Sequence, residues 1–390
     1  MSRGVLALVS AVIALAVGLW LGGHPADLPG PIRDTFVQED RALRAEIIDS
    51  IEDNFYKPVK ESKLDDASLK GIVESLDDPY SSYLTAKEAR QFEEDVSGHF
   101  EGVGMNVEQD RRGLKVLRVF DGSPAEDASI HAGDLILAVD GRPIAGVNSE
   151  VSTNRIKGPA GTTVELRVFT PGERADRTVK VKRERIEVPL TRARLTERDG
   201  HKIGVVELLA FSQGAHAALA RDITRLRRRG ADAIVLDLRG NPGGLLLEGV
   251  AVSSLFIEDG RIVSVRGRHR AERVHNAEGD AILPKDVPMV VLVDGGSASA
   301  SEIVTGALRD RGRATVVGTH TFGKGLVQEV ENLSNGGELK LTTAHYYLPD
   351  GETIITGKGI KPQVRAKDDP KTDRDEALPV ALDTVARKLG

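Results

Sequence analysis

The stretch Asp294-Gly-Gly-Ser-Ala-Ser-Ala-Ser-Glu302 lies between an apolar run at 289–293 and a second apolar pattern at 303–308. The first run has the length and composition of a buried strand, and the second has the apolar stripe of a helix. A serine at such a strand-to-helix turn is well placed as a nucleophile, because backbone N–H groups at a helix N-terminus can hold an oxyanion. The stretch therefore predicts an α/β domain with a reactive serine at this turn.

A second loop, Thr321-Phe-Gly-Lys-Gly325, follows the serine stretch. A serine needs a base to become nucleophilic, and glycines on both sides of Lys324 allow this lysine to approach another backbone. A lysine accepts a proton at neutral pH only where its pKa is lowered from about 10.4. We therefore expect a tight apolar niche around Lys324, formed by Phe322 and the glycines. The two loops together indicate a hydrolase with a serine nucleophile and a lysine base.

Three serines compete for the role of nucleophile, because Ser297 can be a turn residue and Ser301 can cap the helix. The two loops resemble the active-site motifs of the carboxyl-terminal processing peptidases, also called tail-specific proteases. This resemblance implies that Ser299 is the nucleophile and that Lys324, 25 positions later, is the general base. It also implies that Gln328 orients the lysine.

An oxyanion hole needs two hydrogen-bond donors at about 3 Å from the developing charge. One candidate is the backbone N–H of Ala300, directly after the proposed nucleophile. The resemblance implies that the second donor lies in the loop at 236–244, where we expect the N–H of Gly243 or Gly244. Ordinary turn chemistry of asparagine and glycine explains the same loop, and the two interpretations are compatible.

From about residue 186 onward, strand-length apolar runs alternate with helix-like stretches, which predicts a mixed sheet covered by helices. The predicted strands lie at 203–208, 233–238, 289–293 and 314–317. The resemblance adds that this core has a crotonase-like arrangement. The fold class that we expect is α/β and multidomain, with an inserted PDZ domain and an N-terminal helical segment.

Residues 99–184 change to short strands and carry PDZ-like motifs in order. Gly102, Val103, Gly104 and Met105 resemble the loop with which PDZ domains bind a peptide carboxylate, and glycines there allow close approach of a backbone. Similar motifs follow at 122–125, 132–136 and 157–162. The domain is therefore expected to bind the C-terminus of a protein substrate as an added strand.

The N-terminus is apolar from residue 4 to 22, and no charge appears between Arg3 and Asp27. This run is longer than the roughly 7–15 residues of a secretory signal and approaches the about 20 that span a membrane. We expect an anchor with Arg3 inside the cell, and a cleaved signal peptide stays open. In both interpretations the chain after about residue 25 is exported. We therefore expect a periplasmic or extracytoplasmic protein that is anchored to the inner membrane by residues 4–22.

These patterns divide the chain into four parts. The expected parts are a membrane anchor or signal peptide at 1–25, a linker and helical segment at 26–98, a PDZ domain at 99–184, and a serine protease core with a C-terminal helix at 185–390.

Several classes of protein are excluded or disfavoured. A net charge of −6 provides no basic surface for nucleic acid, and the absence of cysteine excludes disulfides and thiolate catalysis. Residues 318–324 match the start of a P-loop, but Gly325 stands where a P-loop has Ser or Thr. His320 is an alternative base without a recognisable acidic partner. No zinc motif is present, so we expect neither a metal nor a cofactor.

The sequence thus predicts an exported serine endopeptidase that cleaves through an acyl-enzyme and recognises apolar substrate C-termini near Met105 and Val107. An activating adaptor or lipoprotein and a homo-oligomer are left open as partners. The alternatives are a catalytically inactive PDZ scaffold with a protease-like core and a protease that stays in the cytoplasm.

Overall fold

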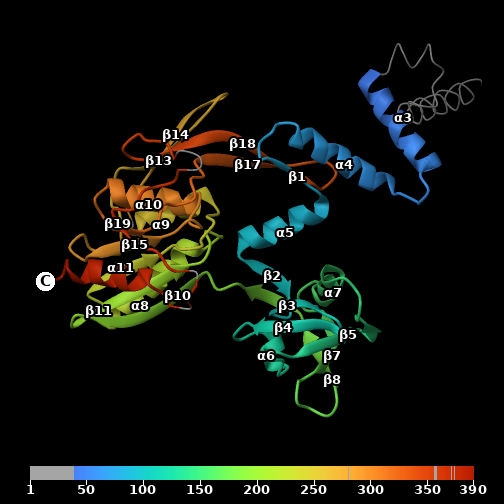
Figure 1. Ribbon diagram of the computed structural model, residues 1–390, viewed down its shortest axis with the longest axis horizontal. Coiled ribbons are helices and arrows are strands. Elements are labelled where there is room, and N and C mark those ends of the chain that lie inside the picture. The colour runs from blue at the N-terminus through green and yellow to red at the C-terminus, as the bar shows by residue number, and fades with distance from the viewer. Residues whose placement is uncertain (1–38, 280, 355–357, 370, 373) are drawn as a thin grey trace, which may run out of the picture. The chain divides into compact units, whose positions relative to one another are not determined.

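The computed structural model describes residues 39–390 except 280, 355–357, 370 and 373 (Figure 1). The chain divides into two compact units, one up to Thr85 with Glu331–Lys340, the other Ala86–Val330 with Leu341–Gly390. The expected anchor at 4–22 lies outside the described residues. Among the helices that are described, none has the length and apolar character needed to cross a membrane.

The first unit contains two helices, as the N-terminal pattern predicts. These are α3 (Glu39–Asn54) and α4 (Glu61–Glu74), which are joined by an ion pair of 2.7 Å between Arg44 and Asp65. Strand β1 (Ser82–Leu84) pairs antiparallel with the first residues of β18 (Glu338–Tyr347). The hydroxyl of Tyr83 donates a 2.9 Å hydrogen bond to Asp66, which ties β1 to α4.

The segment that we expect to be a PDZ domain forms a small antiparallel sheet with two helices. Its strand order is β3 (Met105–Asp110), β4 (Gly113–Val119), β5 (Leu135–Val139), β7 (Thr163–Phe169) and β8 (Arg177–Lys182), with β6 (Arg142–Pro143) paired to β5. The helices are α6 (Pro124–Asp127) and α7 (Ser149–Ile156). The alternating apolar side chains of these strands form one continuous core, because they face the same side of the sheet.

The chain enters and leaves the PDZ domain through a two-stranded ribbon. Strand β2 (His99–Gly102) pairs antiparallel with β9 (Glu184–Glu187), so that Gly102 lies opposite Glu184. Helix α5 (Ala86–Ser97) precedes the ribbon.

The α/β core contains a six-stranded sheet, as the alternating pattern predicts. Its order is β10 (Thr191–Arg198), β11 (His201–Leu208), β12 (Ala233–Asp237), β15 (Met289–Val293), β16 (Thr315–Gly318) and β19 (Val364–Arg365). The hairpin β10–β11 is antiparallel and all other pairs are parallel. Strands β12 and β15 are buried along their whole length, since helices cover both faces of a parallel sheet.

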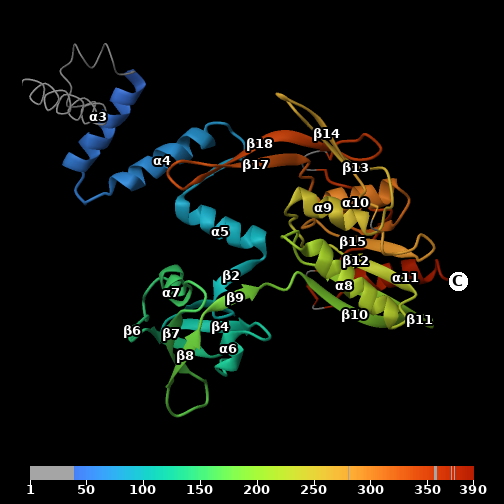
Figure 2. The same cartoon turned by 180° about the vertical axis from the view of Figure 1, so that it is seen from behind.

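Alternate residues of the parallel strands contribute to two separate hydrophobic cores. One face packs against α8 (Ala215–Arg228), α9 (Leu246–Ser254) and α10 (Ala300–Asp310), and the other packs against α11 (Ala377–Ala386). Figure 2 shows these helices around the sheet from behind.

Because β12 and β15 run parallel, the loops that follow them both emerge at the carboxyl edge of the sheet.

A second sheet was not predicted from the sequence. It contains β13 (Arg261–Gly267), β14 (Arg270–Asn276) and β17 (Leu326–Asn332), and β18 pairs with both β13 and β17. Strand β17 begins two residues after Lys324, so the sheet fixes the chain that leaves the lysine loop.

Candidate active site

Ser299 lies at the N-cap of α10 in a backbone conformation that serine rarely adopts. Its φ is 56° and its ψ is −114°, and such a conformation costs about 1–3 kcal/mol. The strain places the side chain at a sharp strand-to-helix turn, as in the nucleophile turns of other hydrolases. The helix begins at Ala300, one residue before Ser301, and its N-cap is Ser299, so the interpretation of Ser301 as the helix cap was wrong.

The hydroxyl groups of the two neighbouring serines are already used in structural hydrogen bonds. Ser297 donates to the carbonyl of Leu238 at 2.8 Å, and Ser301 donates to the carbonyl of Asn241 at 2.9 Å. Both serines are completely buried, whereas Ser299 is 7% exposed. Ser299 is therefore the serine of the triplet that is best placed to react, for a reason independent of any resemblance.

The buried carboxyl group of Glu302 connects the serine turn to the lysine loop. One oxygen accepts the backbone N–H groups of Ser299 at 2.9 Å and Lys324 at 2.8 Å. The other accepts the N–H of Gly323 at 2.7 Å and the hydroxyl of Thr321 at 2.5 Å. Glu302 is 0% exposed, so these four donors satisfy a carboxyl group that water does not reach. No pattern in the sequence indicated that Glu302 joins the two loops.

The lysine loop packs closely against another backbone, as its glycines predict. A Cβ atom at Gly325 would lie 2.0 Å from the carbonyl oxygen of Ile354, so no other residue fits there. Lys324 itself is half-buried. The expected apolar wall is only partly present, because Phe322 is 47% exposed and does not enclose the lysine.

Tyr346 is a residue of this site that the sequence analysis missed. Its side chain, in β18, is 4% exposed and its hydroxyl hydrogen-bonds to the side chain of Ser299. Burial raises the pKa of this phenol, and the bond to Ser299 partly opposes the shift. Its backbone N–H donates to the carbonyl of Gly325 at 3.0 Å, which places the tyrosine beside the lysine loop. A tyrosine in a strand carries no local signal of such a contact.

Gln328 lies in β17, where its amide donates to the hydroxyl of Thr342 at 3.4 Å. Its role in orienting Lys324 stays a prediction. His320, the alternative base, is exposed.

The glycine loop after β12 reaches the nucleophile. A Cβ at Gly243, whose φ is 96°, would lie 2.8 Å from the Cβ of Ser299 and 2.9 Å from the nitrogen of Ala300. The N–H of Gly243 donates to the side chain of Asn241 at 2.9 Å. Within the described part of the chain, no residue accepts a hydrogen bond from the N–H of Ala300 or of Gly244. The choice between Gly243 and Gly244 as the second oxyanion donor therefore stays open.

Asn241 holds this loop in place, as turn chemistry predicts. Its side-chain amide donates to the carbonyl of Leu208 at 2.7 Å, and its own carbonyl accepts the N–H of Ala298 at 3.0 Å. Asn241 is 1% exposed, so this buried network links the glycine loop to the serine turn.

The expected carboxylate loop of the PDZ domain lies between β2 and β3. At Gly104, with φ 84°, a Cβ would lie 2.3 Å from that of Ser123, so only glycine fits. Gly102, Val103 and Met105 are buried. Met105, Asn106 and Val107 of β3 and Thr153 of α7 line part of an open cavity of about 550 Å³. The rest of its lining includes residues of α5 and of the segments 188–192 and 209–212, so the cavity is not a groove of β3 and α7 alone.

A serine at a strained turn, an adjacent glycine loop and a lysine loop fixed by a buried carboxyl group define a serine-type hydrolase. Residues 202–366 match the model of Peptidase family S41, 91–169 that of the PDZ domain, and 42–88 that of the activating protease CtpB N-terminal domain. The chain belongs to the carboxyl-terminal processing peptidases of this family and is a serine-type peptidase.

Relatives over most of the chain support this assignment. The chain is 36% identical over 362 residues to carboxy-terminal processing protease CtpA of Bacillus subtilis (strain 168), covering 92% of this chain and 76% of the relative. It is 37% identical over 338 residues to a probable CtpA-like serine protease of Staphylococcus aureus (strain bovine RF122 / ET3-1), covering 86% and 66%. A solved structure of the photosystem II D1 C-terminal processing protease is 28% identical, with a TM-score of 0.50, covering 90% and 99%.

Proposed function

We propose that this protein is an exported endopeptidase that binds substrate C-termini in its PDZ domain and cleaves peptide bonds with Ser299 and Lys324. The observation that carries this proposal is the strained turn of Ser299, which is joined to the lysine loop by the four hydrogen bonds of Glu302. Its substrates are proteins, since the chain is a carboxyl-terminal processing peptidase with a PDZ domain.

In the proposed reaction, the hydroxyl oxygen of Ser299 attacks the peptide carbonyl and its proton passes to the amine of Lys324. The N–H of Ala300 and one N–H of the glycine loop stabilise the oxyanion. Lys324 then protonates the leaving amine, and an acyl-enzyme remains on Ser299. Water, activated by the same lysine, releases the acyl group. No cofactor takes part in these steps.

The lysine has to be neutral to accept the proton, so activity should rise as the pH approaches and passes the pKa of Lys324. Gln328 is proposed to orient the amine. The PDZ domain would also control the rate, because a bound substrate tail shifts the enzyme toward its active arrangement.

The proposed location is outside the cytoplasm, at the inner membrane, through residues 4–22. Its support is the apolar N-terminal run with a single preceding arginine. Fractionation of cells that express the full-length chain, with protease added to intact spheroplasts, tests this. A protein that remains in the soluble cytoplasmic fraction contradicts the proposed location.

The test of the reaction is cleavage of an unstructured protein with an apolar C-terminal tail by the full-length protein. We expect Ser299→Ala and Lys324→Ala each to abolish cleavage. A fluorophosphonate probe should label the parent at Ser299 and leave Ser299→Ala unlabelled. Full activity of Ser299→Ala would mean that another residue is the nucleophile. Binding of tail peptides by a folded parent without cleavage, alone or with an adaptor, would favour the inactive scaffold.

A further inference from the structure

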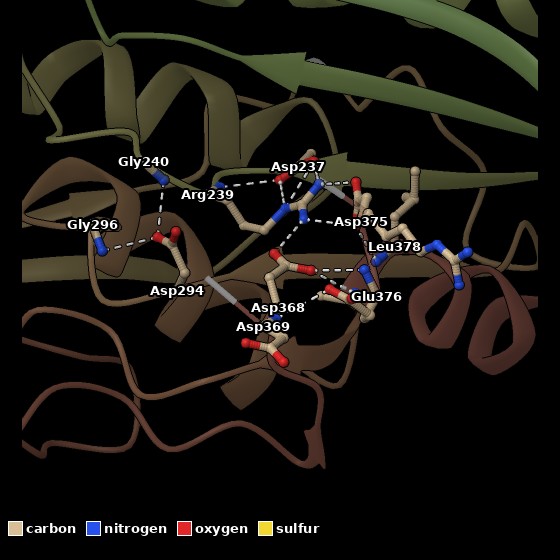
Figure 3. A network of polar contacts seen from close by, with 12 residues as sticks. Asp237, Arg239, Gly240, Asp294, Gly296, Asp368, Asp369, Asp375, Glu376 and Leu378 are labelled. Atoms are coloured by element: carbon tan, nitrogen blue, oxygen red, sulfur yellow. Dashed lines mark hydrogen bonds and ion pairs between the residues drawn. The ribbon is translucent and has the colours of Figure 1, made fainter. Parts of the chain in front are cut away.

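A cluster of charges joins the C-terminal part of the chain to the glycine loop of the active site (Figure 3). At its centre is Arg239, which lies directly before the glycines 240, 243 and 244 of the glycine loop. Its guanidinium group binds Asp237 in a two-point contact, with distances of 3.0 Å from Nε and 2.7 Å from Nη2. It binds Asp375 in a second such contact, with two distances of 2.9 Å. Nη1 also donates to Asp368 at 3.1 Å.

Every N–H donor of this guanidinium group is therefore used, and three carboxylates share one positive charge. The side chain of Arg239 is 18% exposed and that of Asp237 is 8% exposed. Burial disfavours the ionised form of Asp375, but hydrogen bonds from Arg239 and the Leu378 N–H lower its pKa below its usual 3.8. Burial also opposes the charge of Arg239, yet its hydrogen bonds to Asp237 and Asp375 raise its pKa. Arg239 and Asp375 are thus both charged at neutral pH.

Two of these three carboxylates, those of Asp368 and Asp375, also hold the beginning of α11. Asp368 accepts the N–H groups of Glu376 and Ala377, both at 2.9 Å, and Asp375 accepts the N–H of Leu378 at 2.8 Å. These contacts satisfy N–H groups that the first turn of a helix leaves unpaired. The start of α11 and the start of the glycine loop therefore share their anchors.

On its other side, the glycine loop is tied to the serine turn. The N–H of Gly240, the residue after Arg239, donates to Asp294 at 2.9 Å. The same carboxyl oxygen accepts the N–H of Gly296 at 2.9 Å, and Asp294 begins the turn that leads to Ser299. Contacts thus run without a break from the start of α11 to the turn of the proposed nucleophile (Figure 3).

We propose that Asp368, Asp375 and the start of α11 at 376–378 form a positioning element of the active site. Through Asp368 and Asp375 on Arg239, they hold the glycine loop at the distance from Ser299 that an oxyanion hole requires. The proposal rests on the proposed function of this loop. The side-chain contacts described for Arg239 are those with Asp237, Asp368 and Asp375, so we assign it as a positioning residue and not a catalytic one.

A loop of this composition needs such an anchor. Gly240, Gly243 and Gly244 all have positive φ values, of 64°, 96° and 146°, and glycines restrict their own backbone little. A displacement of the oxyanion donors by about 1 Å can lower a rate by about 100-fold. Asp368 and Asp375 form ion pairs with the planar guanidinium group of Arg239, and these ion pairs restrict the displacement of the loop.

The test uses Asp375→Asn in the full-length protein, because asparagine keeps the shape of the side chain and still caps a helix. The matched control is Asp383→Asn. Asp383 also joins α11 to the sheet, through a 2.5 Å contact with Arg198, but it has no contact with the glycine loop. We expect Asp375→Asn to lower kcat by about 10-fold and to change KM by less than about twofold. The double variant that combines Asp368→Asn and Asp375→Asn should lower kcat further. Asp383→Asn should retain the parental kcat.

A second measurement does not depend on activity. Hydrogen exchange followed by mass spectrometry should show faster exchange at residues 239–245 in Asp375→Asn, and unchanged exchange at 201–208 of β11. Parental exchange and parental kcat in Asp375→Asn overturn the proposal. Equal losses of kcat and of melting temperature in Asp375→Asn and Asp383→Asn also overturn it, because they indicate a general role of α11 in stability. Full activity of Ser299→Ala, with faster loop exchange in Asp375→Asn, would instead refute the proposed function and leave the anchoring intact.

Discussion

Glu302 is the residue on which both loops of the site depend, because its carboxyl group accepts four hydrogen bonds without reaching water. In Glu302→Gln, an NH2 group replaces one acceptor oxygen and faces N–H or O–H donors. Each buried donor left unpaired costs about 1–3 kcal/mol. We expect a loss of unfolding free energy of about 2–5 kcal/mol and a loss of activity, measured by urea unfolding and peptide cleavage. The exposed Glu352→Gln is the control and should change neither; an active Glu302→Gln of parental stability contradicts this account.

Tyr346 gives a prediction on pH. Its pKa is raised above 10.0 in the folded protein, mainly by burial, so the unfolded chain loses this proton at a lower pH than the folded one. Stability that depends on Tyr346 is therefore present below about pH 10 and falls as the pH rises further. Tyr346→Phe lacks this component, and the difference in unfolding free energy between parent and variant should change between pH 9 and 11. A constant difference over this range contradicts the prediction.

Tyr346→Phe also removes the hydrogen bond to Ser299, and we expect kcat/KM to change by about 3–10-fold. The variant Tyr347→Phe, at the next position of the same strand, serves as the control for this readout. The two tyrosines project to opposite sides of the strand, so only Tyr346 meets the nucleophile.

At the scale of elements, the glycine loop and the serine turn fit together without space for a side chain. In Gly243→Ala, the new Cβ would lie 2.6 Å from the carbonyl oxygen of Ala298, in a backbone with φ of 96°. We expect kcat to fall by about 100-fold, because the loop has to move away from Ser299. Gly230→Ala is the matched control, with φ of 88° and its nearest neighbour 3.8 Å away. It should cost about 1 kcal/mol of stability and leave kcat unchanged.

The elements of the core sheet and its helices follow from apolar periodicity, and the predicted strands at 203–208, 233–238, 289–293 and 314–317 are confirmed within a residue or two. Strands β13, β14 and β18 were missed, because charged and polar residues interrupt their apolar residues. Strands of this kind lack the continuous apolar run that marks a buried parallel strand.

At the scale of the whole molecule, the joint presence of a PDZ domain and a serine peptidase core suggests that the substrate tail and the cleaved bond are bound separately. We expect a substrate with a free C-terminal carboxylate to be cleaved at least about 10-fold faster than its C-terminal amide. The comparison uses peptides of identical sequence and initial rates below KM. The free acid and the amide should bind equally at Ser299 of the core. Equal cleavage rates of the two peptides would therefore mean that the PDZ domain has no part in substrate recognition.

The sequence by itself determined the order of domains, the α/β core, the two loops of the site and the glycines that permit close approach, because these depend on local periodicity and backbone freedom. Only the tertiary structure decided that Glu302 joins these loops, that Tyr346 meets Ser299, and that Asp375 reaches Arg239 across 136 positions of sequence. Each of these contacts joins residues from different elements, whose distance depends on how helices pack on the sheet. No local pattern records that packing, and the exposure of Phe322 was mispredicted for the same reason.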